Sequence, residues 1–110
     1  MKLSGILMMG LLVFAFTGLQ DVRANEADEA FATGEKYYNG DGVTQDYAEA
    51  FKWFRKAANQ GDAEAQFNIA GMYLNGKGVT QNYTEAKIWF LKAAEQGFQP
   101  ARDAFQKISR

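Results

Sequence analysis

The chain has 110 residues, no cysteine, no histidine and a formal net charge of −1, and this length allows one small domain. Without thiol and imidazole groups, the common zinc, haem and iron–sulfur ligand sets are excluded, as are Cys–His and Ser–His catalytic pairs. A slightly acidic chain lacks the clustered Lys and Arg that nucleic-acid binding requires. We therefore expect no cofactor and no nucleic-acid partner, while a calcium or magnesium site made of carboxylates alone stays open at this point.

The first 24 residues predict a signal peptide rather than a part of the fold. Lys2 supplies a positive start, and an almost continuous apolar run covers residues 3–19. Val22 and Ala24 then occupy the −3 and −1 positions of a signal-peptidase site, which predicts cleavage between Ala24 and Asn25. An uncleaved anchor is the alternative, although one membrane span needs about 20 apolar residues and this run is shorter. We therefore expect an exported protein, periplasmic or else secreted, with no stable membrane insertion after cleavage.

The rest of the chain repeats itself with an offset of 36 residues. Ala27–Gly61 and Ala63–Gly97 share 19 identical residues in 35 aligned pairs. The chain has a single proline and no strand-like alternation, so the repeating unit is helical. We predict an all-α fold, a short α-solenoid of two helix-turn-helix repeats over residues 25–61 and 62–98, followed by a C-terminal capping helix over residues 99–110.

The first helix of each unit differs between the two copies. In the second unit it runs from about Ala63 to Leu74, with Asp62 as its N-cap. Its inward stripe has four members: Ala65, Ile69, Ala70 and Tyr73. The first unit replaces the first three of these with more polar or smaller residues: Glu29, Thr33 and Gly34. A polar face is expected there because no repeat precedes it.

A glycine-rich loop joins the two helices of each unit, NGDGVTQDY in residues 39–47 and NGKGVTQNY in residues 75–83. A phosphate cradle would need a preceding strand and a Gly-Lys-Ser/Thr ending. A calcium loop would need acids in both copies, yet Lys77 replaces Asp41 and Asn82 replaces Asp46. Two glycines, a valine and a helix-capping residue persist, and a tight helix connection requires these. We predict a structural turn and no metal site.

The second helix of each unit begins at a capping box, Asp46 with Glu49 and Asn82 with Glu85. Gly61 and Gly97 then provide the C-terminal stops. Four aromatic residues lie on the apolar stripe of these helices and are predicted to be core rather than a ligand box, with an edge of each tryptophan exposed: Trp53, Phe54, Trp89 and Phe90. A closing helix starts at Pro100 and extends to Ser109.

The combined glycine, tryptophan and double-alanine spacing resembles the Sel1-like repeat, a relative of the tetratricopeptide repeat. The second unit matches at these positions: Ala65, Ile69, Ala70, Tyr73, Gly76, Gly78, Val79, Asn82, Ala86, Trp89, Phe90, Lys92, Ala93, Ala94 and Gly97. The first unit matches from Gly34 and Tyr37 onward. Thr44 and Thr80 stand where the family often has proline, and the disulfide of many secreted relatives is missing, which weighs against a β-lactam-directed role. The resemblance implies an α-solenoid that binds proteins or peptides.

In such a solenoid the first helix of each unit lines the concave side. Removal of the core stripe leaves Ala32 and Gly71 on this side together with the eight candidate partner-binding residues. These are Phe31, Glu35, Lys36 and Asn39 in the first unit and Phe67, Asn68, Met72 and Asn75 in the second. Phe67 and Met72 have the character of apolar anchors in a peptide groove. Completion of the core between repeats is an equally good interpretation of these two residues, and the sequence leaves both open.

We therefore predict a non-enzymatic interaction module, an exported adaptor or regulator that binds another envelope protein or a peptide. The alternatives are an inhibitor or immunity-type protein that caps an enzyme or toxin, a secreted protein that acts on host cells, and a small cell-wall hydrolase. No carboxylate pair in the sequence supports the hydrolase. Ile88 and Leu91 replace Lys52 and Arg55 of the first unit, so a homo-oligomer or a second partner surface is a further hypothesis.

Overall fold

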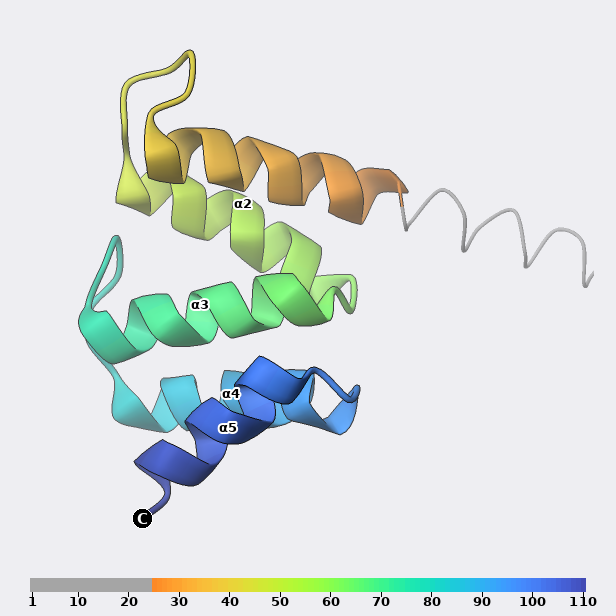
Figure 1. The fold of residues 1–110 in the computed structure, drawn as a ribbon. Helices are drawn as coiled ribbons and strands as arrows, with labels where there is room; N and C mark the ends of the chain where they lie inside the picture. Colours follow the sequence, from red (N-terminus) through yellow and green to blue (C-terminus); the bar gives the residue numbers. More distant parts are fainter. Residues whose placement is uncertain (1–24) are drawn as a thin grey trace, which may run out of the picture.

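The computed structural model describes residues 25–110, and these residues form helices and loops without any strand. A first helix covers residues 25–39, and it is followed by α2 (Tyr47–Asn59), α3 (Ala63–Asn75), α4 (Tyr83–Glu95) and α5 (Gln99–Ile108) (Figure 1). The all-α prediction is therefore confirmed. The predicted signal peptide, up to Ala24, lies outside the described residues.

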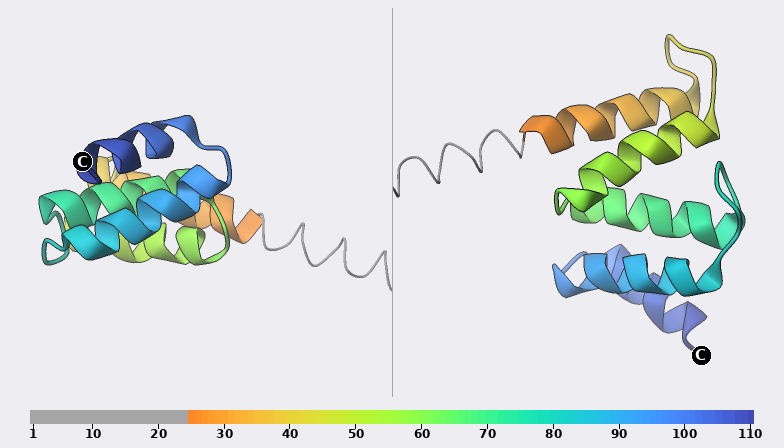
Figure 2. Two further views of the ribbon diagram at one scale, coloured as in Figure 1. Left: turned by 90° about the horizontal axis from the view of Figure 1, so that it is seen from below. Right: turned by 180° about the vertical axis from the view of Figure 1, so that it is seen from behind.

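The helices form two hairpins and a closing helix that stack in chain order. α3 packs against both α2 and α4, and α5 packs against α4, as the two views of Figure 2 show. Each helix therefore meets its neighbours in the series, which is the arrangement of a solenoid. Within residues 25–110, no helix has both the length and the apolar character needed to cross a membrane.

The second helix of each repeat is capped by the predicted residue, although the capping box is only half formed. Asp46 Oδ1 accepts the backbone N–H of Glu49 at 3.1 Å, and Asn82 makes the same bond to Glu85 at 3.0 Å. The backbone N–H of Asp46 donates to the carbonyl oxygen of Tyr37 at 2.9 Å. This bond joins the two helices of the hairpin, and it takes the donor that a full capping box would assign to the glutamate.

Gly61 ends α2 and leads directly into the N-cap of α3. Its φ is +98°, and its N–H donates to Ala58 O at 3.0 Å while the N–H of Asp62 donates to Ala57 O at 3.2 Å. These two bonds form a Schellman motif, in which glycine is favoured because of its positive φ. The Asp62 carboxylate then accepts the N–H of Ala65 at 3.0 Å. One short turn therefore ends one repeat and begins the next, as predicted.

The core is built mostly from alanine and aromatic residues. Phe54 and Phe90 are each 2% exposed and Trp89 is 7% exposed, so their assignment to the core is confirmed. Trp53 is half-buried, and the Lys56 ammonium lies 5.5 Å from its ring centroid. Trp53 therefore keeps part of its ring in contact with solvent, as expected for a large indole.

Gly34 does not belong to a polar outer face, and this part of the prediction is wrong. Gly34 is buried, and a Cβ placed on it would lie 2.7 Å from Cδ1 of Phe54. The glycine makes room for that ring inside its own repeat. Glu29 is exposed and Thr33 half-buried, which agrees with a more polar face at these two positions.

The glycine-rich loop of the second repeat is a joint between repeats. A Cβ on Gly78 would collide with the backbone carbonyl of Tyr47, at the start of α2. The corresponding Gly42 has no such neighbour within 4 Å, because no repeat precedes it within the described residues. The loop therefore has two structural roles: it connects the two helices of its own repeat, and it packs against the preceding repeat.

α5 attaches to the solenoid in the way that α3 does. Gln66 Nε2 donates to the carbonyl oxygen of Ala58 at 3.1 Å, and Arg102 Nε donates to that of Ala94 at 3.2 Å. Gln66 and Arg102 occupy the same repeat position, as do Ala58 and Ala94. The exposed side of α5 is polar, with Gln99, Asp103, Gln106 and Lys107 all exposed. α5 therefore occupies the place that the first helix of a third repeat would have, and its exposed side is polar, as in a terminal capping helix.

Candidate functional site

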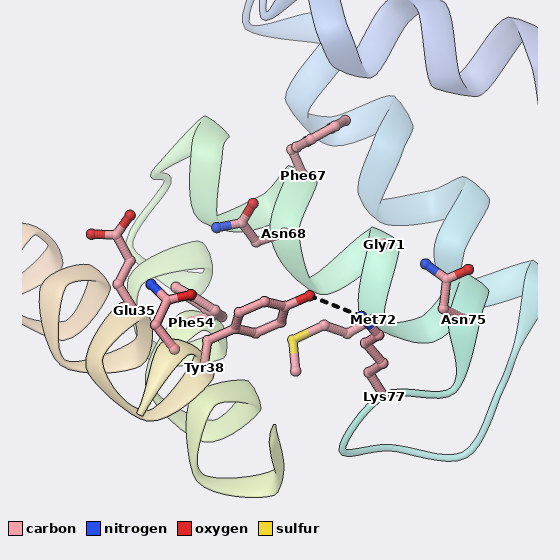
Figure 3. A pocket seen from close by; sticks show the side chains of 10 residues that line it. Glu35, Tyr38, Phe54, Phe67, Asn68, Gly71, Met72, Asn75 and Lys77 are labelled. Atoms are coloured by element: carbon pink, nitrogen blue, oxygen red, sulfur yellow. Dashed lines mark hydrogen bonds between the residues drawn. The ribbon is translucent and has the colours of Figure 1, made fainter. Parts of the chain in front are cut away.

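A cavity of about 320 Å³ opens between the first helix and α3; we call it the groove (Figure 3). Glu35, Tyr38 and Asn39 of the first helix form one wall, Phe67, Asn68, Gly71, Met72 and Asn75 of α3 form the other, and Phe54 and Lys77 complete it. Its size falls at the lower end of the range of small-ligand and peptide pockets. The groove brings both repeats together in one site.

The base of the groove is apolar and aromatic. Phe54 is 2% exposed and Met72 is 3% exposed, so both present only a small face to the groove. The Tyr38 ring lies 6.3 Å from that of Phe54 between centroids. The Phe67 ring lies 5.6 Å from the ring of Phe90, which fixes its position against α4. Rigid, pre-packed aromatic surfaces bind apolar side chains at a small entropic cost.

The rim of the groove carries amides. Asn39 and Asn75 hold the same position in the two repeats, and both are exposed, whereas Asn68 is half-buried. A side-chain amide has two donor hydrogens and an acceptor oxygen, so it can pair with both groups of a peptide backbone. An apolar base with an amide rim therefore suits an extended segment of polypeptide.

Lys77 connects the loop of the second repeat to the aromatic residues of the first. Its Nζ donates to Tyr38 Oη at 3.3 Å, and it lies 5.6 Å from the Tyr38 ring centroid and 5.3 Å from that of Tyr47. The hydrogen bond with Tyr38 and charge interactions with the two tyrosines raise the pKa of Lys77. The residue is exposed, so its positive charge remains available to a partner.

Six of the eight predicted partner-binding residues line the groove: Glu35, Asn39, Phe67, Asn68, Met72 and Asn75. Phe31 does not, because its half-buried ring packs on Phe54 at 5.4 Å between centroids. Lys36 is exposed but lies outside the lining. Met72 and Phe67 both contribute to the core and to the groove, so the two interpretations left open by the sequence are compatible.

Sequence reasoning missed Tyr38, Phe54 and Lys77 as groove residues. It places Gly71 on the concave face but does not include it among the binding residues. The exchange of Asp41 for Lys77 between the repeats was the available signal for one of them. The exchange argues against a calcium loop, and it also marks a contact between repeats, since Lys77 contacts Tyr38 and Tyr47 of the first repeat. Asp41 has no preceding repeat to contact within the described residues.

The lining of the groove contains groups that can bind a ligand. Glu35 is the single carboxylate among the lining residues, whereas a glycosidase needs two. Within residues 25–110, no three Asp or Glu side chains gather closely enough to hold a metal ion. Apolar contact, amide hydrogen bonds and one charge of each sign are what the groove presents to a ligand.

A separate apolar surface lies on α4. Ile88 is 42% exposed and Leu91 is 41% exposed, and they lie one turn apart on the helix. Lys52 and Arg55, at the same positions of α2, are exposed and charged. A role of this surface in self-association stays a prediction.

Comparisons with known proteins agree with this architecture. Residues 30–62 and 63–98 match the family model described as Sel1 repeat. A Sel1 repeat protein from Oxalobacter formigenes superposes with a TM-score of 0.73 at 35% identity, over 74% of this chain and 24% of that one. Cysteine rich protein B of Helicobacter pylori gives a TM-score of 0.70 at 28% identity, over 73% of this chain and 60% of that one.

A third structure is a protective antigen present in uropathogenic Escherichia coli strains, which displays an SLR fold. It gives a TM-score of 0.64 at 45% identity, over 64% of this chain and 15% of that chain. This chain therefore spans less than two thirds of the length of each of the three. No curated protein matches it. Since both repeats match the family model and the solved structures share the fold, the chain belongs to the Sel1 repeat family.

Proposed function

We propose that this protein is a non-enzymatic adaptor or regulator that binds an extended segment of another envelope protein in the groove. Sel1 repeats are scaffolds for protein–protein interaction and are typically non-enzymatic. The observation that carries the proposal is the groove itself, in which both repeats contribute an exposed asparagine beside an apolar base. Such a site holds a peptide backbone by amide pairing and selects among side chains by its apolar surface.

Export is a component of the proposal, and the sequence supports it through the predicted signal peptide. Cleavage between Ala24 and Asn25 would release residues 25–110 into the periplasm. The intact mass of the protein recovered by osmotic shock tests this component, because a mass that begins at Asn25 is expected. Recovery of the uncleaved chain with the membrane fraction would contradict it.

A protein that acts on a host outside the cell is the second candidate. The similarity to a protective antigen of uropathogenic Escherichia coli favours it, although this chain corresponds to 15% of that protein. Secretion into the culture supernatant would support this candidate over the periplasmic adaptor.

Capture of partners from envelope extract tests the groove. We expect the doubly substituted Asn39→Ala, Asn75→Ala protein to lose the partners that the unchanged protein captures, because both rim amides are removed. Asn59→Ala is the matched control, since Asn59 is an exposed asparagine on a helix outside the groove. Equal capture by the double variant and the control would place the binding surface elsewhere.

A further inference from the structure

Gly71 has no structural reason to be glycine. It lies within α3, and its φ is not among the positive values of the chain. A Cβ placed on it would meet no atom within 4 Å. Glycine inside a helix is unfavourable compared with alanine, because it loses more backbone freedom on folding.

The other glycines of residues 25–110 each have such a reason. Gly34 makes room for the Phe54 ring. The rest have positive φ, a conformation that side chains rarely adopt: Gly40, Gly42, Gly61, Gly76, Gly78 and Gly97. Gly71 alone in this part of the chain combines an ordinary helical backbone with open space. That space belongs to the groove, because Gly71 lies in its wall between Phe67 and Asn75 (Figure 3).

The charges of the groove are arranged across this opening. Glu35 is the residue of the first repeat that corresponds to Gly71, and it stands on the opposite wall. Figure 3 shows Glu35 and Lys77 on opposite sides of Tyr38. They are the only acidic and the only basic residue of the lining. A ligand that is complementary to this field has a basic group toward Glu35 and an acidic group toward Lys77.

We propose that the missing side chain of Gly71 is a specificity device: it admits a large apolar side chain of an extended peptide segment, flanked by a basic residue on the Glu35 side and an acidic residue on the Lys77 side. This inference rests on the proposed function, and it names the class of segment that the groove binds. The apolar side chain lies against Phe67 and Met72, and the peptide backbone pairs with the asparagines of the rim.

The test uses short random peptides displayed on phage and selected on the purified protein. Enriched peptides are expected to share a large apolar residue, such as Leu, Met or Phe, between residues of opposite charge. A synthetic copy of an enriched peptide is then measured against Gly71→Ala and Gly71→Leu, with Asn59→Ala as the control. We expect affinity to fall about tenfold or more for Gly71→Ala and further for Gly71→Leu, because the added atoms occupy the space of the ligand side chain.

Thermal unfolding distinguishes occlusion of the groove from damage to the fold. Gly71→Ala is expected to melt at a higher temperature than the unchanged protein while binding more weakly, a combination that a merely structural glycine does not give. A lower melting temperature for Gly71→Ala would overturn the inference, as would full affinity for the selected peptide. Enriched peptides without a shared order of charges would also overturn it.

A second selection, on the Glu35→Lys variant, checks the charge order. The basic residue of the enriched peptides is expected to be replaced by an acidic one. Peptides that bind in the groove, lose affinity with Asn39→Ala, Asn75→Ala and yet ignore Gly71→Ala would leave the proposed function intact and refute this inference alone. If no peptide is enriched, or if the enriched peptides ignore the rim asparagines, the proposed function fails and the inference fails with it.

Discussion

Gly78 of the second repeat packs against the backbone carbonyl of Tyr47 in the first so closely that no side chain fits between them. Lys77, the preceding residue, donates a hydrogen bond to Tyr38 of the first repeat. The loop that joins the two helices of one unit therefore also joins two units. The walls of the groove come from different repeats, so this joint sets the distance between them.

Substitution of Gly78 by alanine should destabilise the protein more than substitution of Gly42. Both glycines have a φ near +70°, and alanine in this conformation costs about 1–2 kcal/mol. Only Gly78→Ala adds the collision with Tyr47, for which about 1–3 kcal/mol more is expected. Urea unfolding followed by circular dichroism measures both. Equal losses in the two variants would show that the loop does not press on the first repeat.

The same substitution should have opposite effects at two helical glycines. Gly34→Ala puts a methyl group 2.7 Å from the Phe54 ring, and we expect a loss of about 1–3 kcal/mol. Gly71→Ala fills open space and should stabilise by about 0.5–1 kcal/mol, since alanine favours the helix. Denaturant midpoints at equal m-values give the comparison. Effects of the same sign at both sites would contradict the packing described for Phe54.

Removal of the Tyr38 hydroxyl should lower the pKa of Lys77. The hydrogen bond with Tyr38 is the largest cause of the raised pKa, and Tyr38→Phe deletes it. The interaction of protonated Lys77 with the tyrosines stabilises the fold fully below pH 10.5, the ordinary pKa of lysine. This stabilisation is lost as the pH rises through the raised pKa of Lys77 in the folded protein. A carbon-detected NMR titration of the Lys77 side chain measures this shift. An unchanged midpoint in Tyr38→Phe would show that the bond is not held in solution.

Gln66 should matter more to stability than its equivalent in α5. Gln66 is 6% exposed, and its Oε1 also accepts Gln96 Nε2 at 2.8 Å. Gln66→Leu removes both of these bonds. Because Ala58 O still accepts the N–H of Gly61 and Gln96 is exposed, a loss of about 0.5–1.5 kcal/mol is expected. Arg102 is exposed, and water can replace the bond that Arg102→Leu removes. Chemical unfolding measures the loss in unfolding free energy for each variant. A larger loss for Arg102→Leu than for Gln66→Leu would contradict the prediction.

Features that depend on neighbours in sequence were predictable. The N-caps at Asp46 and Asn82 and the stop at Gly61 depend on short-range backbone geometry, so their sequence signals are specific. Most of the groove was also predictable. Once the apolar stripe of the first helix of a repeat is assigned to the core, the positions that remain face outward. Glu35 and Asn75 were found in this way.

The features that the sequence hid are contacts between helices, either of two repeats or of one hairpin. The position of Lys77 over two tyrosines depends on how one repeat stacks on the other, and no spacing within a repeat encodes it. The polar face predicted for Gly34 follows from the absence of a preceding repeat, and that argument takes no account of a contact within the hairpin. The ring that fills its space comes from Phe54, on the opposite helix of the hairpin.

The matching bonds of Gln66 and Arg102 make the two joints of the solenoid interchangeable. Suppose that a copy of residues 62–97 is inserted after Gly97. Gln66 of the copy would then donate to the carbonyl of Ala94 in the preceding unit, and Arg102 would donate to the carbonyl of Ala94 in the copy. The chain length would grow by one unit while each junction kept its bond to the carbonyl of Ala58 or Ala94, although Lys77 of the copy would meet Leu74 in place of Tyr38. Duplication of one repeat in the gene would then lengthen the surface that contacts a partner without requiring a new type of contact between repeats.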